Sequence, residues 1–314
     1  MSGPTTDQQT DGTLLPGLDG TNPLGFLAAL GVLRAVTIIG QRDRVRLSWE
    51  TGSGTWVPRL AGSAGSQDGL LNLLDQHLLR RFEQHPLGRL LTQEHPDPVS
   101  RREDLASKVR NATHHDHLLV DWLGALTSDG VAPGVNSQLQ LVRRDYFSGN
   151  VRSVLERTER SHLEHSLFST WDYADPLDNQ SLHFDPGEDR RHALQWNQPS
   201  GDPDRKKSGG MLGASRLAVE ALPLFTSLPE RGRLHTLGFS GLRRDDTRWT
   251  WPVWRHPIDL ETTRSLLGLP ELQQEHPSED ALRHLRRRGV VAVLRTHRIL
   301  VGKTPNFTPA QRIA

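Results

Sequence analysis

The chain has no cysteine among its 314 residues. It therefore forms no disulfide, offers no thiolate nucleophile, and builds neither a cysteine-ligated zinc site nor an iron–sulfur cluster. Lysine is scarce as well, with only Lys108, Lys206, Lys207 and Lys303, so arginine carries most of the positive charge. Arginine suits bidentate phosphate contacts and stacking on aromatic rings, although a GC-rich genome supplies the same bias.

A marked excess of charge is also lacking. The formal net charge is +1 at pH 7, and 24% of the residues are charged. This balance excludes a globally basic nucleic-acid binder, so any contact with nucleic acid must come from local patches.

A long hydrophobic run is absent too. The longest apolar stretch, residues 21–40 (TNPLGFLAALGVLRAVTIIG), is interrupted by Arg34, and its apolar part is shorter than the roughly 20 residues that a membrane span needs. A signal peptide begins with a basic region, but Asp7, Asp11 and Asp19 precede this stretch. We therefore expect a cytoplasmic protein without membrane contact.

Residues 21–40 predict a buried helix that organises the N-terminal part of the chain. Asn22 is a good N-cap, and Pro23 fits the first helical position. A helix that is apolar on nearly every side is buried. Small residues along it allow neighbouring backbones to approach closely: Gly25, Ala28, Ala29, Gly31 and Ala35. Arg34 is the one residue of this helix expected to do more than pack, by reaching an edge of the domain.

Composition and periodicity indicate an α+β protein in five parts. We expect a disordered tail at 1–12, an N-terminal α+β unit at 13–66, a helical region at 67–170, a functional loop at 171–210 and a C-terminal α+β unit at 211–314. In the N-terminal unit, a short strand at 14–18 precedes the helix. Alternating runs at 44–50 and 55–60, around a TGSG turn, predict a β-hairpin.

The C-terminal unit is predicted to begin with a second small-residue helix at 213–225. Strands at 233–240 and 247–254 follow, then helices at 259–269 and 278–288 with Asp259 and Ser278 as N-caps. Runs at 290–295 and 298–301 look like a final hairpin. In the helical region, a helix over 135–159 is expected, with a possible break at Gly149.

The stretch 171–210 is rich in Asp, Pro, Gly and Asn. It offers two short strand candidates, 181–185 and 192–196. A segment of this length and composition inside a compact protein is usually functional or disordered, and its interspersed aromatic residues argue against full disorder.

One cluster could ligate a metal. His114, His115, Asp116 and His117 are followed by Asp121, which shares a helix face with His117, and imidazole with carboxylate suits a divalent ion. His162 and His165 are the best additional ligands. The simpler interpretation is a solvated helix start. The sequence also has no P-loop, Rossmann fingerprint, HExxH helix or nucleophile elbow.

Basic residues beside aromatic ones are more suggestive, because such loops contact phosphates and stack bases. The candidate nucleic-acid-binding residues are Arg190, Arg191, Arg205, Lys206, Lys207, Arg243, Arg244 and Arg248, with Trp251 or Trp254 as a stacking partner. Arg286, Arg287 and Arg288 end a predicted helix. Two plainer interpretations remain: the tryptophans belong to a sheet core, and arginine at a helix C-terminus favours the helix dipole.

Three groups of stretches resemble a known family. They are LPGLDGTNPLGFLAALGVLRAV (14–36), HFDPGEDRRHALQW (183–196) with GASRLAVEALPLF (213–225), and GFSG…WTWPVW (238–254) with VGKTPNFTPA (301–310). Together they resemble proteins of type I-G (formerly I-U) CRISPR–Cas loci, of the large-subunit-like or helicase-nuclease-extension type. Residues 61–170 match nothing in that pattern.

The resemblance implies a subunit of an RNA-guided, Cascade-like surveillance complex in antiviral defence. Such a subunit contacts guide RNA, target DNA and neighbouring subunits, and a separate helicase-nuclease performs the cleavage. The resemblance therefore implies a non-catalytic protein without metal or cofactor, in agreement with the lack of catalytic motifs. The residues alone leave two alternatives open. One is a metal-dependent nuclease or phosphohydrolase that uses the His114–His117 cluster. The other is a protein–protein adaptor without nucleic-acid contact.

Overall fold

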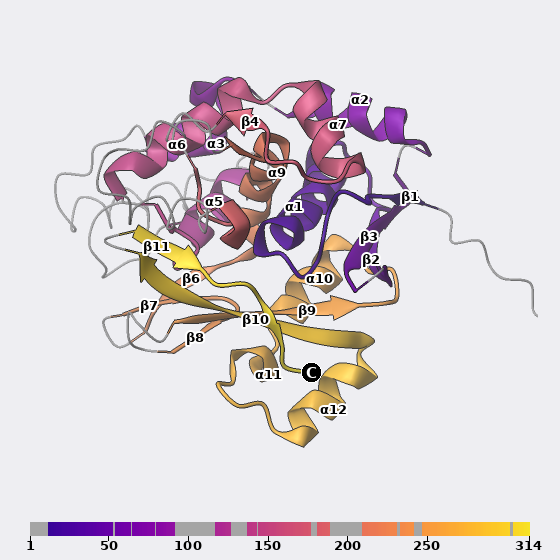
Figure 1. Ribbon diagram of the computed structural model, residues 1–314, viewed down its shortest axis with the longest axis vertical. Helices are drawn as coiled ribbons and strands as arrows, with labels where there is room; N and C mark the ends of the chain where they lie inside the picture. The colour runs from indigo at the N-terminus through magenta and orange to yellow at the C-terminus, as the bar shows by residue number, and fades with distance from the viewer. Residues whose placement is uncertain are drawn as a thin grey trace, which may run out of the picture.

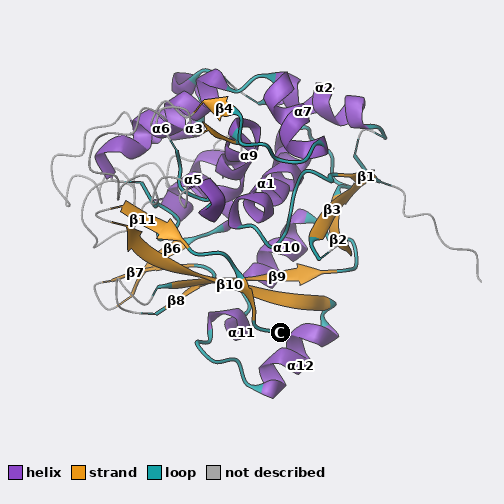
Figure 2. Cartoon of the chain, viewed as in Figure 1, coloured by secondary structure: helices purple, strands orange, loops and turns teal. Residues whose placement is uncertain are grey.

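The computed structural model describes residues 12–52, 54–63, 65–78, 80–91, 117–126, 137–142, 144–176, 181–188, 209–230, 233–241, 247–301 and 304–314. A layer of helices lies over a mainly antiparallel sheet, and two further helices cover the other face of that sheet (Figure 1, Figure 2). The predicted α+β class is confirmed. Within the described part of the chain, none of the helices has the length and apolar character needed to cross a membrane.

The helix predicted at 21–40 is present and central. α1 (Pro23–Arg34) is buried along its whole length, and a π-helical turn, η1 (Ala35–Ile39), continues it. Asn22 caps the helix as predicted, because its side-chain oxygen accepts hydrogen bonds from the N–H groups of Leu24 at 2.8 Å and Gly25 at 3.4 Å.

α1 crosses a second small-residue helix in backbone contact. This helix is α9 (Leu212–Ala221), which a short 3-10 turn, η4 (Leu222–Leu224), extends. A Cβ atom on Gly31 would lie 1.8 Å from the carbonyl oxygen of Leu217. Only glycine fits there, so the close approach expected from the small residues is confirmed at this crossing.

Further helices surround the α1–α9 pair (Figure 1). They are α2 (Gln67–His77), η2 (Phe82–Gln84), α3 (Pro86–Leu91), α5 (His117–Leu126), α6 (Arg144–Arg157) and α7 (Arg160–Phe168). Helices therefore make up most of the described part of 67–170. The helix expected over 135–159 is shorter than predicted, because residues 137–142 are not helical and α6 starts at Arg144. α6 runs through Gly149 without a break.

The main sheet has the order β11-β10-β9-β8, and β12 also pairs with β10. Its strands are β8 (Phe239–Ser240), β9 (Arg248–Trp254), β10 (Val290–Val301), β11 (Thr304–Phe307) and β12 (Gln311–Arg312). α10 (Leu260–Leu267) follows β9, with Asp259 as its N-cap. α11 (Pro270–Gln273) and α12 (Glu279–Arg287) lie on the face of the sheet away from α1 (Figure 1).

The prediction of a final hairpin from 290–295 and 298–301 is wrong. Residues 290–301 form one strand, because Thr296 and His297, expected at the turn, pair with Trp249 and Arg248. The hairpin is formed by β10 and β11 instead. The strand predicted at 233–240 is likewise divided into β7 (Arg233–Thr236) and β8, and β7 pairs with β6 (Ser227–Glu230).

Two smaller sheets complete the fold. The N-terminal hairpin is confirmed as β2 (Arg46–Thr51) with β3 (Trp56–Ala61), and the short β1 (Thr13–Leu14) adds to β3. β4 (Asp175–Pro176) pairs with β5 (Gly209–Gly210). The strand expected at 181–185 is not formed, and His183 there has a left-handed backbone with φ 60°. The strand candidate 192–196 and the tail 1–11 lie outside the described residues.

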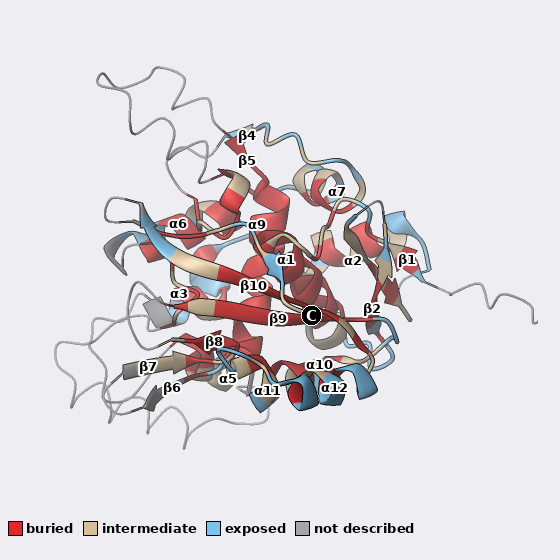
Figure 3. Ribbon diagram, turned by 60° about the horizontal axis from the view of Figure 1, so that its bottom comes forward, coloured by how far each residue is buried: buried red, intermediate tan, exposed pale blue. Residues whose placement is uncertain are grey.

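The N- and C-terminal units share one core rather than forming separate ones. Phe26 of α1 stacks on Trp49 of β2 and also contacts Trp251 and Trp254 of β9. The indole N–H of Trp254 donates to the carbonyl oxygen of Leu47 at 2.7 Å. Figure 3 shows the resulting band of buried residues along α1, α9 and β9. The predicted units 13–66 and 211–314 are therefore separate stretches of sequence that do not have independent cores.

Candidate functional site

Most of the predicted nucleic-acid-binding residues lie outside the described structure: Arg190, Arg191, Arg205, Lys206, Lys207, Arg243 and Arg244. The structure does describe the residues on either side of the two segments that hold them. The first segment is bounded by Glu188 and by Gly209 at β5, on the helical side of the molecule. The second is bounded by Gly241 and Thr247, beside β8 and β9 in the main sheet. Figure 3 separates β4 and β5 from β8, and Figure 1 likewise separates β4 from β8, so these anchors are not brought together.

Arg248 is partly buried and forms an ion pair of 2.6 Å with Glu275. Trp251 and Trp254 are 0% and 1% exposed. The indole N–H of Trp251 donates to the carbonyl oxygen of Gly20 at 3.0 Å. Neither ring has a free face for a nucleic-acid base, so their assignment as stacking partners is corrected to the plainer alternative, a role in the sheet core.

The proposed metal cluster is only partly described. His114, His115 and Asp116 lie outside the described residues, and His117 begins α5. Asp121 forms an ion pair with Arg264 at 2.8 Å instead. His162 and His165 lie near different carboxylates, Asp175 at 3.8 Å and Asp172 at 3.1 Å. Among the described residues, no three His, Asp or Glu side chains are grouped as metal ligands.

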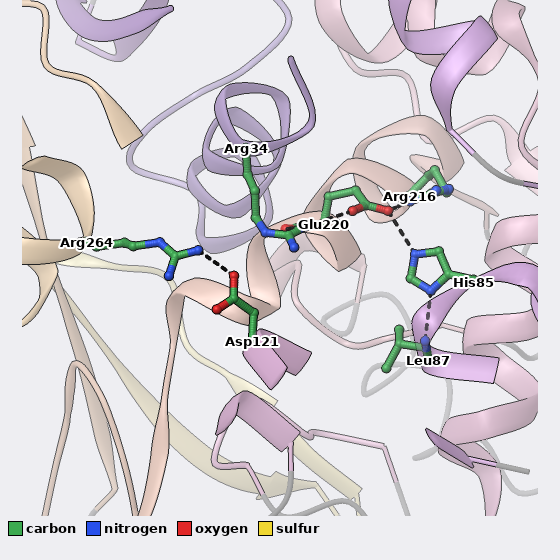
Figure 4. Close-up of polar contacts among 7 residues, drawn as sticks. All are labelled: Arg34, His85, Leu87, Asp121, Arg216, Glu220 and Arg264. Atoms are coloured by element: carbon green, nitrogen blue, oxygen red, sulfur yellow. Dashed lines mark hydrogen bonds and ion pairs between the residues drawn. The ribbon is translucent and has the colours of Figure 1, made fainter. Parts of the chain in front are cut away.

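The most organised polar site is one that the sequence did not predict. Arg34, at the end of α1, does not reach an edge; it is 1% exposed. Its guanidinium donates to the carboxylate of Glu220 on α9 at 3.1 Å. Arg216, one turn earlier on α9, donates to the other oxygen of the same carboxylate at 2.8 Å. Glu220 therefore binds two buried guanidinium groups from two crossing helices (Figure 4).

His85, just before α3, completes this site. Its Nε2 lies 3.0 Å from Oε1 of Glu220, and its Nδ1 accepts the backbone N–H of Leu87 at 3.1 Å. Because Nδ1 is an acceptor, the proton of the neutral ring sits on Nε2 and is donated to Glu220. We call Arg34, His85, Arg216 and Glu220 the buried charge cluster.

An outer pair flanks the buried charge cluster. Asp121 of α5 binds Arg264 of α10 on the side facing Arg34 (Figure 4). The Arg34 guanidinium lies 5.4 Å from the centroid of the Trp122 ring, and the His85 ring meets the same indole edge to face at 5.1 Å. The guanidinium is therefore held by a carboxylate and by an aromatic face.

Charge in the cluster is unbalanced. Burial tends to raise the pKa of Glu220, but Arg216, His85 and Arg34 outweigh this effect and hold the pKa far below its usual range. Burial lowers the pKa of His85, against the opposing effect of Glu220, and the two arginines lower it further. At neutral pH the cluster thus holds two cations, one anion and a neutral imidazole. It is suited to joining α1, α9 and the start of α3, and its burial keeps it from solvent.

We predict that the His85→Gln variant loses less free energy of unfolding on mild acidification than the native chain does. The folded pKa of His85 lies below its usual 6.5, so the unfolded chain binds more protons and the stabilisation present above pH 6.5 is lost below it. Glu220 adds its own loss only below 4.5. Urea unfolding midpoints at about pH 7.5, 6.5 and 5.5 should fall less steeply for H85Q than for the native chain. Parallel curves would contradict the assignment.

A signal for this site was present in the sequence. Arg34 interrupts an otherwise apolar helix, and a buried cation needs a counter-charge. Glu220 is the only acidic residue in the apolar segment 212–224. Predicting from sequence that Arg34 pairs with Glu220 would have required knowing that α1 crosses α9. No comparable signal marked His85.

A second polar site joins the start of α1 to the turn at residues 185–187. The side-chain amide of Asn22 donates to Asp185 at 3.1 Å, and the same carboxylate oxygen accepts the N–H of Gly187 at 2.7 Å. Asp185 is 1% exposed. His183 and Tyr173 nearby in the chain have left-handed backbones with φ values of 60° and 57°, a conformation that costs energy for side chains of this size. The start of α1 thus fixes a strained loop.

Comparison with known proteins assigns the chain to no family: no family model matches it, and neither does any curated protein sequence.

Proposed function

We propose that the chain is a non-catalytic, nucleic-acid-binding subunit of a type I CRISPR RNA-guided complex. In this role it contacts guide RNA or target DNA through arginine-rich loops, and it docks on neighbouring subunits in the cytoplasm. A separate helicase-nuclease is the expected partner for cleavage. The proposal rests on the resemblance of separate stretches of sequence to that family.

The observation that carries the proposal is that these stretches meet in space. Gly20 and Asn22 belong to the first stretch. Gly20 accepts the indole N–H of Trp251 from the third, and Asn22 binds Asp185 from the second. Gly31 packs on Leu217 in the helix of the second group. Stretches that lie apart in sequence thus form one contiguous unit, which a resemblance of all three to one family requires.

The direct test is affinity capture of the full-length chain, expressed together with its neighbouring genes and a guide RNA. Guide RNA and other subunits should copurify with it. An adaptor would bring the subunits but show no nucleic-acid affinity of its own. A metal-dependent hydrolase would instead contain metal after purification and lose activity on His117→Ala.

Charge reversal at Arg243 and Arg244 should weaken nucleic-acid binding and flatten its salt dependence. The slope of log K against log salt is negative, and each lost phosphate contact reduces its magnitude by about 0.7 for single strands and about 0.9 for duplex DNA. Arg80→Glu is a suitable control, because Arg80 is exposed and already paired with Asp75 on the helical side. The measurement is fluorescence anisotropy over a salt series. Unchanged affinity and slope in R243E/R244E would remove these two residues from the interface.

A further inference from the structure

Exposed arginines from three segments gather at the start of β10. Arg287 ends α12 and Arg288 is its C-cap, Arg255 follows β9, and Arg312 lies on β12; all four are exposed. Arg255 donates its backbone N–H to the carbonyl oxygen of Gly289 at 3.2 Å. We call these four residues the α12 arginine surface.

The backbone fixes this gathering. Gly289 has a left-handed φ of 82°, and a Cβ atom there would lie 3.3 Å from the ring of His256. The turn after α12 therefore places Arg288 beside the end of β9. On the other edge of β10, the guanidinium of Arg312 donates to the carbonyl oxygen of Val291 at 3.0 Å. β9 and β12 flank β10, so Arg255 and Arg312 lie on opposite edges of the same strand. The backbone of Arg312 pairs with Leu294, farther along β10, and its guanidinium reaches back to Val291 near the start of the strand.

Nearby acids are already engaged elsewhere. On α12, Glu279 pairs with Arg286 at 2.8 Å and Asp280 with Arg283 at 3.0 Å. Glu271 pairs with His284 at 3.0 Å. Among the described residues, none of the ion pairs found involves Arg255, Arg287, Arg288 or Arg312, and Arg288 acts on Glu271 only by helping the hydrogen bond from His284 to lower the pKa of its carboxyl. A favourable interaction with the helix dipole accounts for arginine in the last turn of α12, but not for Arg255 and Arg312 from other segments.

We propose that the α12 arginine surface binds the phosphate backbone of a nucleic acid, an inference that rests on the proposed function and names a surface for it. An interface with a protein has an apolar centre, whereas an interface with nucleic acid is polar and rich in positive charge. The exposed large apolar side chains, Tyr146, Leu228, Ile299 and Leu300, lie on other elements or near the opposite end of β10. Ile299 is about 30 Å along the strand from Val290.

The test compares two triple variants of the full chain with equal changes in charge. R255Q/R287Q/R288Q removes three of the four arginines of the surface and leaves Arg312 and its backbone hydrogen bonds in place. R80Q/R152Q/R160Q is the control, because each of its arginines pairs with a carboxylate on the helical side: Asp75, Glu83 and Asp68. The probes are a random 30-nucleotide single-stranded RNA and a random 30-base-pair DNA duplex, titrated by anisotropy over a salt series.

We expect the surface variant to bind at least tenfold more weakly near 0.1 M salt. The magnitude of its slope of log K against log salt should be smaller by about 2 to 3, while the control changes much less. Equal losses in the two variants, with native binding intact, would overturn the surface but not the proposed function. Failure of the native chain to bind either probe would overturn both. Native-like nucleic-acid binding by the surface variant, together with loss of a copurifying subunit, would assign the surface to a protein partner instead.

Discussion

Replacing Glu220 with alanine should destabilise the chain by about 3–5 kcal/mol, the usual cost of leaving a buried charge without its partner. The carboxylate is 2% exposed and is the counter-charge of both Arg34 and Arg216. Without it, two guanidinium groups remain buried with no compensating anion on α9. His85 also loses the acceptor of its Nε2 proton. Urea unfolding followed by circular dichroism measures the effect.

Glu83→Ala is the matched control for this prediction. Glu83 also pairs with an arginine, Arg152 at 3.1 Å, but its side chain is 59% exposed, and surface pairs of this kind contribute about 0–1 kcal/mol. If E220A yields no folded protein, E220Q retains a neutral acceptor at the same position and should show a smaller loss in the same direction. Equal midpoints for E220A and E83A would show that the buried charge cluster contributes no more than a surface pair.

Local signals predicted the elements well. Asn22, Asp259 and Ser278 each accept the backbone hydrogen bond expected of an N-cap. The hairpin of β2 and β3 followed from alternation, and α1 followed from its apolar length. These features depend on residues within a few positions of one another, where propensity and capping act.

The predictions were wrong where contacts between residues far apart in sequence determine the structure. Arg34 was expected at an edge, but its partner Glu220 lies 186 positions away, and no local pattern connects them. Residues 296–297 looked like a turn, yet pairing with β9 extends β10 through them. Trp251 and Trp254 beside basic residues resembled a stacking surface. The plainer interpretation placed them in a sheet core, and only the position of Phe26 against them decides between the two.

The candidate interface was predicted less completely than the fold. Basic and aromatic composition indicated the loops that hold Arg190 and Arg243, but composition cannot say which loops meet. The α12 arginine surface needed three segments to converge around Gly289. Sequence singled out Arg286, Arg287 and Arg288 as a group and gave no reason to join them to Arg255 or Arg312. Such convergence depends on β-strand order, which is a property of the whole fold.

Replacing Gly31 with alanine should cost about 3 kcal/mol or more, at the upper end of the usual penalty for overpacking. The added methyl group would lie 1.8 Å from a backbone oxygen of α9, and a helix backbone cannot rotate away as a side chain does. The measurement is the urea midpoint. Gly149→Ala in α6 is the control: nothing lies within 4 Å of its Cβ position, so the better helix propensity of alanine should stabilise the chain by about 0.5–1 kcal/mol.

The two large effects should also be coupled. Arg34 is three residues after Gly31 on α1, and Glu220 is three residues after Leu217 on α9, so the ion pair lies one turn from the backbone contact. A methyl group that separates the helices at Gly31 therefore stretches the Arg34–Glu220 pair as well. G31A/E220A should be less destabilised than the sum of the single variants, because each change already removes part of the same contact. Strict additivity would mean that the α1–α9 crossing holds its backbone contact and its buried charge cluster independently.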